Sequence, residues 1–484
     1  MGNDMLTPGS NCWRIEPATR VSVIVDADDY FRVVGDAMMH AQHRIMLIGW
    51  DFDARIRLGD VGQDEAPEQL GAFISWVAER TPSLDFYLLR WDLGALKTLL
   101  RGTTVFTVLK WMRHRNIHTK LDGTHPVGAS HHQKIVIIDD CFAFCGGIDT
   151  TGDRWDTRAH RDDDPGRRSP NGKPYKPWHD ATTALQGKAA GALAELCRDR
   201  WHRAGGTPIA PIDANTGYWP EMLPVHFHDA DVAIARSEPE MPGRPSVLEI
   251  EQLYVDQIAA ARDVIYAESQ YFASRRIAEA IVKRIEEEDG PEIVLINPQT
   301  AQGWLEPLAM DTARARLFET IRRRDKNGRF RIYHPFTAAG EAIYVHAKIL
   351  IADDRSIRVG SSNMNNRSMR LDTECDVTID TRQPANGGCG GVITMLRDDL
   401  LAEHLGVAPD VIAASLAKTG SLIATIEALR GTGKTLRPYE TPDLTEVEAW
   451  LADNEVLDPE GPSEMFESTS KRGLFRNFRW RRAT

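Results

Sequence analysis

One short motif occurs twice in this chain, and it constrains the fold more than any other feature. "HHQKIVIIDD" begins at residue 131 and "VHAKILIADD" begins at residue 345, so two copies of one pattern lie 214 residues apart. The pattern is a His, a Lys two residues later, four uncharged residues and an Asp, with a Gly and a small neighbour seven residues further on. Its members are His132, Lys134 and Asp139 in the first copy and His346, Lys348 and Asp353 in the second. A chain of 484 residues can hold two domain-sized units, so the repeat predicts two similar halves.

The residues ahead of each motif repeat as well. "YFRVVGDAMMHAQHRIMLIGWDFD" from Tyr30 and "EIEQLYVDQIAAARDVIYAESQYF" from Glu249 each predict an amphipathic helix that leads into a buried strand. Further helical stretches alternate with strands, which is typical of an α/β fold with a sheet flanked by helices. We expect a first half over residues 1–210, a Pro-rich linker over 211–245, a second half over 246–400 and a helical extension with a basic tail over 401–484. The two halves would be related by a pseudo-twofold axis, with one shared active site between them.

Strand parity separates the Asp of each motif from its His and Lys. Side chains alternate across a strand, so His132 and Lys134 share one face while Asp139 lies on the other, and the second copy has the same parity. Each Asp should therefore bond backbone or basic groups behind its strand, and the carboxylate that orients each His must come from elsewhere in the chain. The pairs Gly146-Gly147 and Gly360-Ser361 should let backbone N–H groups approach a ligand, and Asp149 and Asn363 hold matching positions just beyond them.

Two His and two Lys side chains that converge on one site suit a tetrahedral phosphate. Lysines offset the charge on the phosphate oxygens, one neutral His can attack phosphorus, and the other His, when protonated, can protonate the leaving oxygen. This chemistry needs no cofactor or metal. The six cysteines are scattered without zinc-ligand spacing, and we expect no metal site.

The chain resembles the phospholipase D superfamily in its paired H-x-K-x4-D motifs. "YAESQYF", "GGIDTTGDRWDT" and "PWHD" are similar to further segments of that family, the last two to its eukaryotic-type enzymes. The resemblance covers most of residues 30 to 400 and implies that His132 is the nucleophile and His346 the general acid. It also implies an acid for each imidazole: Glu374, 28 residues after His346, for His346, and Asp180, 48 residues after His132, for His132. Candidate substrate-binding residues are Gly147, Ser361, Asn363 and Gln270.

The reaction is better determined than the substrate. Phospholipase D activity is the first choice, giving phosphatidic acid by hydrolysis and phosphatidyl esters when an alcohol accepts the phosphatidyl group. A cardiolipin-synthase-like phosphatidyltransferase, a superfamily nuclease and a non-catalytic interaction protein are the alternatives. The net charge of −12 disfavours nucleic acid as a partner, because such binding depends on neutralising many phosphates.

Location, assembly and membrane contact are further expectations. The first residues lack a secretory signal pattern, so we expect a cytoplasmic location, while export by a route without a signal peptide stays open. Because one chain carries both motifs of a shared site, we expect a monomer. The tail "KRGLFRNFRWRR" from Lys471 interleaves cations with aromatic side chains, a pattern that suits peripheral contact with an anionic membrane.

Overall fold

Each half of the chain builds the same seven-stranded unit, which confirms the predicted repeat. The computed structural model describes residues 5–61, 65–91, 103–213, 217–301 and 310–442. The strands of the first half are β1 (Arg14–Val25), β2 (Arg44–Gly49), β3 (Asp85–Trp91), β4 (Ile117–Asp122), β5 (Ile135–Ile138), β6 (Phe142–Gly146) and β8 (Ala181–Gly187). Those of the second half are β9 (Phe227–Glu238), β11 (Val264–Glu268), β12 (Glu292–Ile296), β13 (Phe330–Phe336), β15 (Ile349–Ala352), β16 (Ser356–Gly360) and β17 (Glu374–Asp380).

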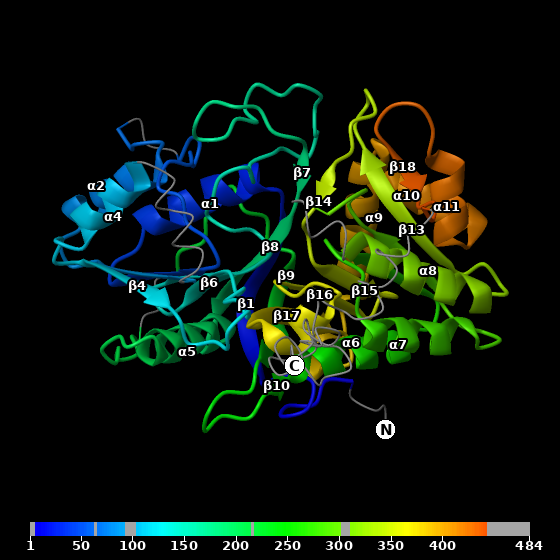
Figure 1. Ribbon diagram of the computed structural model, residues 1–484, viewed down its shortest axis with the longest axis horizontal. Coiled ribbons are helices and arrows are strands. Elements are labelled where there is room, and N and C mark those ends of the chain that lie inside the picture. Colours follow the sequence, from blue (N-terminus) through cyan, green and yellow to red (C-terminus); the bar gives the residue numbers. More distant parts are fainter. Residues whose placement is uncertain (1–4, 62–64, 92–102, 214–216, 302–309, 443–484) are drawn as a thin grey trace, which may run out of the picture.

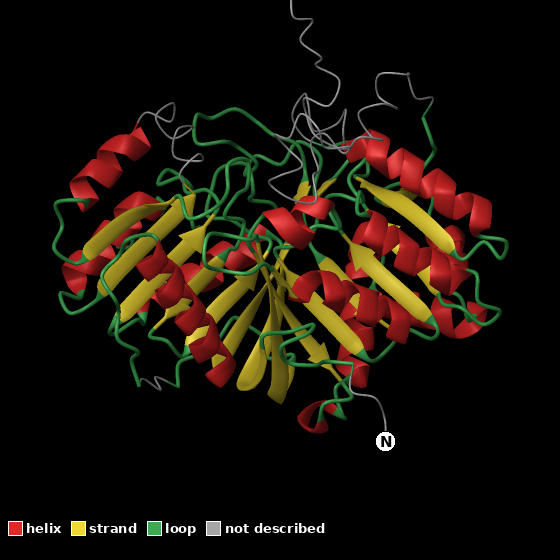
Figure 2. Ribbon diagram, turned by 60° about the horizontal axis from the view of Figure 1, so that its bottom comes forward, coloured by secondary structure: helices red, strands yellow, loops and turns green. Residues whose placement is uncertain are grey.

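The two units join edge to edge into a single mixed sheet. β1 and β9 pair antiparallel at its centre, with Ala18 opposite Ala230. Outward from this pair the order is β8, β6, β5, β2, β3, β4 on one side and β17, β16, β15, β11, β12, β13 on the other. Figure 2 shows these strands as one fan that passes through both halves. The mirrored order is the pseudo-twofold relation expected from the sequence, and β18 (Thr435–Pro438) and β10 (Val247–Leu248) add short strands beside β13 and β9.

Helices cover the sheet from both faces (Figure 1). Those of the first half are α1 (Ala27–Met39), α2 (Leu70–Arg80), α4 (Thr103–Trp111) and α5 (Lys188–Arg203). Those that follow are α6 (Glu249–Ala260), α7 (Arg275–Ile285), α8 (Thr312–Arg324), α9 (Gly390–Leu405), α10 (Pro409–Thr419) and α11 (Leu422–Leu429), with a π-helical turn at Arg367–Leu371 and a 3-10 turn at Pro384–Asn386.

The hydrophobic core is shared between the halves on one face of the sheet and separate on the other. Leu193 of α5 and Leu400 of α9 belong to one continuous buried cluster. On the opposite face, α1 and α2 pack in a second cluster and α6 and α7 in a third. Full burial of each such aliphatic side chain stabilises the fold by about 1.5–3 kcal/mol. The shared cluster fixes the two halves against each other, and with them the two motifs.

The segment expected to be a linker contains a central strand. Residues 227–238 form β9, which lies between β1 and β17 in the middle of the sheet. Its sequence, "FHDADVAIARSE", starts with polar residues and sits between Pro-rich stretches, which hid its buried second half. The linker prediction is therefore wrong for these residues, and the second half begins before residue 246.

The extension after residue 400 is tied to the second half. α9 begins at Gly390 and β18 pairs antiparallel with β13. Among the described helices, none is by itself both long and apolar enough to cross a bilayer. α9 and α10 are long and apolar enough only when they are taken together, and the chain bends by 106° between them. The predicted basic tail lies outside the described residues.

Candidate active site

The segment that precedes each motif His crosses to the opposite half. β14 (Tyr344–Val345), just before His346, pairs in parallel with β7 (Trp178–His179), and the His346 N–H donates to the His179 carbonyl at 2.7 Å. In the same way, the His132 N–H donates to the Thr373 carbonyl at 3.0 Å. Asp180 and Glu374 directly follow these two acceptors. Each motif His is therefore placed beside the carboxylate of the other half.

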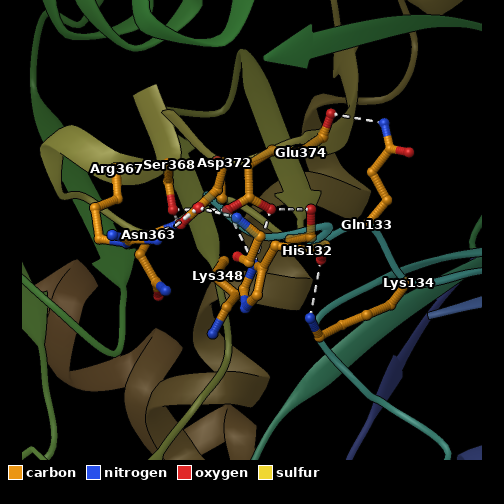
Figure 3. A network of polar contacts seen from close by, with 12 residues as sticks. His132, Gln133, Lys134, Lys348, Asn363, Arg367, Ser368, Asp372 and Glu374 are labelled. Atoms are coloured by element: carbon orange, nitrogen blue, oxygen red, sulfur yellow. Dashed lines mark hydrogen bonds and ion pairs between the residues drawn. The ribbon is translucent and has the colours of Figure 1, made fainter. Parts of the chain in front are cut away.

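The two imidazole–carboxylate pairs are exchanged between the halves. Nδ1 of His132 lies 2.9 Å from both carboxylate oxygens of Glu374, and Nδ1 of His346 lies 2.7 Å from Oδ2 of Asp180. Figure 3 shows the first pair, with the Ser368 hydroxyl on the far side of Glu374. All four residues were predicted from the sequence, but each acid was predicted to hold the His of its own half, and that pairing is wrong. The short segment before each motif His pairs with a segment of the other half, and the spacing of residues along the chain does not reveal such pairing. The exchange could therefore not be predicted from residue spacing.

The two motif lysines lie at the same site and have different partners. Nζ of Lys134 donates to the His132 carbonyl at 2.9 Å and forms an ion pair of 3.2 Å with Oδ2 of Asp149. Nζ of Lys348 donates to the His346 carbonyl and lies 3.5 Å from Oε1 of Gln270. The motif cations and imidazoles thus meet in one place, as the shared-site prediction requires.

Asp139 and Asp353 lie behind their strands, as the parity argument predicts. The Asp139 carboxylate accepts hydrogen bonds from the backbone N–H groups of residues 42, 43 and 44, at 2.7–2.8 Å. Asp353 accepts the equivalent bonds from residues 262, 263 and 264, at 2.8–2.9 Å. Each Asp therefore anchors the end of the neighbouring strand, β2 or β11, and acts on the site only by positioning the motif.

The small residues after the motifs make room for carboxylates, which differs from their predicted role. A Cβ on Gly147 would lie 2.3 Å from Oδ1 of Asp180. The Gly147 N–H donates to the Ala181 carbonyl, and the Ser361 N–H to the Cys375 carbonyl. Because both N–H groups donate to backbone carbonyls of neighbouring segments, they are not free to bind a ligand. The prediction that they face a ligand is therefore wrong. The Ser361 hydroxyl instead donates to Glu374 at 2.5 Å and helps to hold it.

Gln270 and Asn363 come together beside Lys348. Oε1 of Gln270 accepts from Nδ2 of Asn363 at 3.4 Å, and its Nε2 donates to the Tyr344 hydroxyl at 2.9 Å. These contacts leave both predicted residues within reach of the Lys348 ammonium. Their contact with substrate stays a prediction.

Three side chains near the imidazoles were missed from the sequence. The ring of Trp178 lies 5.1 Å from that of His346, and the Arg154 guanidinium lies 4.1 Å above the same Trp. On the other side, the Trp50 ring approaches His132 edge-on at 6.3 Å. The first two lie within the quoted "GDRWD" and "PWHD" segments, so they could have been proposed from the resemblance. Each imidazole therefore has one Trp ring beside it.

Burial and the lysines set the charge state of the site. Burial, reinforced by Lys134 and Lys348, lowers the pKa of His132 well below its ordinary value. Burial, with Lys348 and Arg154, does the same to the pKa of His346. Burial lowers the pKa of Lys348 to about 7 and raises the pKa of Asp180 and of Glu374. Both imidazoles are therefore neutral at neutral pH without a bound anion, and a phosphate would favour protonation of one of them.

Comparisons with known proteins agree with this geometry. A family profile described as "Cardiolipin synthase, PLD-like domain" matches residues 254–386. Phospholipase D A of Dictyostelium discoideum is 25% identical over 463 residues, covering 81% of this chain and 36% of that protein. Phospholipase D alpha 1 of Carica papaya is 24% identical over 528 residues, and the match covers 78% of this chain and 64% of the papaya protein. The chain thus spans less than two thirds of the length of these relatives.

A solved structure shares the fold. The phosphatidylserine synthase of Haemophilus influenzae superposes with a TM-score of 0.55 at 15% identity, over 85% of this chain and 96% of the synthase. Two repeated α/β units, two H-x-K-x4-D motifs at one site, the matched family profile and the phospholipase D relatives agree with one another. Together these findings support a place for the chain in the phospholipase D superfamily.

Proposed function

We propose that this protein is a phospholipase D, which transfers the phosphatidyl group of a glycerophospholipid to water or an alcohol through a phosphohistidine intermediate. The observation that carries the proposal is the pair of exchanged dyads, His132–Glu374 and His346–Asp180. A carboxylate on Nδ1 fixes each ring and leaves its Nε2 for the reaction. Among the described residues, neither Nε2 has a hydrogen-bond partner.

The first step forms the intermediate. Nε2 of neutral His132 attacks phosphorus, a P–N bond forms, and the bond from phosphorus to the head-group oxygen breaks. His346, protonated once the anionic phosphate is bound, gives its Nε2 proton to that oxygen, so the head group leaves as an alcohol. Asp180 stabilises the imidazolium in the meantime. Lys134 and Lys348 offset the charge that builds on the remaining phosphate oxygens.

The second step reverses the roles. His346, now neutral, takes a proton from a water or alcohol molecule as its oxygen attacks phosphorus. The P–N bond breaks, the electron pair returns to Nε2 of His132, and the product leaves as phosphatidic acid or a phosphatidyl ester. Both side chains regain their starting protonation.

An apolar cavity beside the motif favours a lipid substrate over a nucleic acid. A cavity of about 260 Å³ opens next to Lys134 and Asp149, with walls that include Phe52, Trp111 and Leu88. Burying acyl carbons there would contribute about 0.8 kcal/mol for each CH₂ group. The net charge of −12 opposes a nucleic acid as the substrate.

Product analysis with an ethanol series tests the proposal. Purified protein is incubated with vesicles of phosphatidylcholine or phosphatidylethanolamine, and the products are measured by mass spectrometry. We expect phosphatidylethanol to rise at the expense of phosphatidic acid, because ethanol and water compete for the same intermediate. Head-group release without an alcohol adduct at any ethanol concentration would argue for direct attack by water.

Two further arms separate the alternatives. Phosphatidylglycerol as the added acceptor would give cardiolipin if the protein is mainly a phosphatidyltransferase. Single-stranded DNA cleavage without lipid turnover would place it among the nucleases. His132→Ala serves as the inactive control in every arm. Contact of the 471–484 tail with anionic membranes, the cytoplasmic location and the monomeric state stay predictions.

A further inference from the structure

A second cluster of ionisable side chains is buried behind the His346–Asp180 dyad. Its members are Asp26, His160, His179 and Glu403, which are 1%, 1%, 0% and 8% exposed. They come from the start of α1, the loop between β6 and β7, β7 itself and α9. One ligand atom from each lies within 4.8 Å of the others. The mechanism above uses none of these four side chains.

The spacing of these atoms is that of metal ligands. Nε2 of His160 lies 3.0 Å from Oε1 of Glu403 and 3.4 Å from Oδ2 of Asp26. Nδ1 of His179 lies 2.8 Å from the same Glu403 oxygen and 3.4 Å from Oδ1 of Asp26. Ligands about 2.0–2.2 Å from a tetrahedral metal lie about 3.3–3.6 Å from one another, so small shifts would complete a site.

Carboxylates outside the cluster hold both rings in the orientation that metal binding requires. Nδ1 of His160 is 3.0 Å from Oδ2 of Asp156, and Nε2 of His179 is 2.7 Å from Oε2 of Glu268. Each ring thus has its distal nitrogen engaged and its other nitrogen directed at Glu403 and Asp26. Metal-binding histidines almost always have such a carboxylate or carbonyl on the distal nitrogen.

One oxygen in the cluster lacks a hydrogen bond. Oδ2 of Asp26 is buried, and no described donor bonds to it. A buried carboxylate oxygen without a hydrogen bond costs free energy. A cation among the four ligands would remove this cost.

We propose that Asp26, His160, His179 and Glu403 bind one divalent transition metal, with Zn²⁺ the preferred ion. Two imidazole nitrogens and two carboxylate oxygens suit Zn²⁺ better than Mg²⁺ or Ca²⁺, which prefer oxygen ligands alone. No metal site was expected from the sequence, because the cysteines are scattered and no metal-ligand spacing is visible. The four ligands proposed here are spread from residue 26 to residue 403.

The metal would hold parts of both halves around the catalytic dyad. Oδ1 of Asp26 accepts the Asp180 N–H at 3.0 Å, and the His179 carbonyl accepts the His346 N–H at 2.7 Å. Glu403 brings in the C-terminal extension, and His160 anchors the loop after β6. The four ligands are thus positioning residues for Asp180 and His346, and the ion takes no part in the phosphoryl transfer.

Protons are the competing occupant. If all four ring nitrogens of His160 and His179 donate to carboxylates, both rings are imidazolium ions. Two such protons and one divalent metal supply the same charge, so a measurement of activity cannot distinguish the protonated cluster from the metal-bound one. A measurement of the metal content of the protein can distinguish them.

The experiment measures metal in protein without a tag, purified without chelators. Equilibrium dialysis against Zn²⁺, Mn²⁺ or Co²⁺ is followed by mass-spectrometric metal analysis. We expect about one equivalent per chain in the wild type, and at least a fivefold loss in His160→Ala and in Glu403→Gln. His118→Ala, which alters a half-exposed ring on β4, is the matched control and should retain the metal.

Two readouts guard against misfolded variants. Co²⁺-loaded wild type should show the intense visible bands of a tetrahedral site, and dipicolinate should lower the melting temperature of the wild type but not of Glu403→Gln. Wild type that retains no more metal than His160→Ala after loading with all three ions would overturn the proposal. Equal metal in the wild type and both cluster variants would also overturn it. Neither result depends on whether the protein hydrolyses phospholipids.

Discussion

The two halves of the molecule place the same residues at the site but surround them differently. Lys134 has the carboxylate of Asp149 at 3.2 Å, whereas the matching position in the second half is Asn363 and, among the described residues, Lys348 forms no ion pair. The side chain of His132 is 15% exposed and that of His346 is 7% exposed. A repeated motif can thus supply two different environments within one site. The more accessible ring, that of His132, suits attack on phosphorus.

Removing either imidazole should have the largest effect. His132→Ala and His346→Ala should each lower kcat by about 10⁴-fold or more, because nucleophile and acid act as one unit. A substrate with a nitrophenol leaving group sharpens the comparison, since its departure needs no proton. His346→Ala should then give a burst of nitrophenol, and His132→Ala should give none. Equal bursts from the two variants would mean that the roles are not divided in this way.

The exchanged pairing is tested by changing one carboxylate at a time. Glu374→Gln and Asp180→Asn should each lower kcat by about 10²- to 10⁴-fold, through loss of ring orientation and of charge stabilisation. Nitrogen-labelled histidine should reveal which ring each acid holds. Glu374→Gln should move the Nδ1 resonance of His132, and Asp180→Asn that of His346. Movement of the His of the same half instead would contradict the crossed arrangement.

A reciprocal exchange at positions 149 and 363 should move the pH profile. Burial lowers the pKa of Lys348 to about 7, so its ammonium is lost, and activity with it, as the pH rises through that value. Asn363→Asp should raise this pKa and move the alkaline limb of kcat/KM to higher pH. Burial and the lysines lower the pKa of His132 and Asp149 opposes them, so Asp149→Asn should move the acid limb to lower pH. An unchanged profile in both variants would show that these neighbours do not tune the site.

The hydroxyls behind Glu374 should give the smallest effect. The Ser361 and Ser368 hydroxyls donate to this carboxylate, at 2.5 and 2.7 Å, whereas Asp180 receives the Ala181 backbone N–H at 2.8 Å. Loss of one such bond costs about 1 kcal/mol, or roughly fivefold in rate. Ser368→Ala should therefore lower kcat by about that factor, with exposed Ser83→Ala as the control. A loss near that of Glu374→Gln would mean that Ser368 does more than hold the acid.

Sequence reasoning succeeded where a property is local to a strand. Side-chain alternation predicted that Asp139 and Asp353 do not hold their own His, and both indeed bond backbone N–H groups. Each Asp directly follows its strand with a positive φ, 51° and 55°, so its exact placement depends on that turn as well. Sequence reasoning failed for β9, because Pro-rich neighbours and a polar start concealed a buried strand. It also misread Gly147, whose missing side chain makes room for Asp180. In these two cases the deciding contact comes from residues far away in the chain.

The sequence by itself determined that there are two α/β halves, that each brings one His and one Lys, and that Asp180 and Glu374 belong to the site. These follow from a repeated pattern and its resemblance to a family. Only the tertiary structure decided which acid holds which His, because the parallel contacts of residues 130–132 with 373 and of β14 with β7 carry each motif across the pseudo-twofold axis. Likewise, only the tertiary structure showed that Asp26, His160, His179 and Glu403 lie together. Spacing along a chain fixes which side chains share a strand face, but neighbours across an interface depend on how the core of β1, β9, α5 and α9 packs.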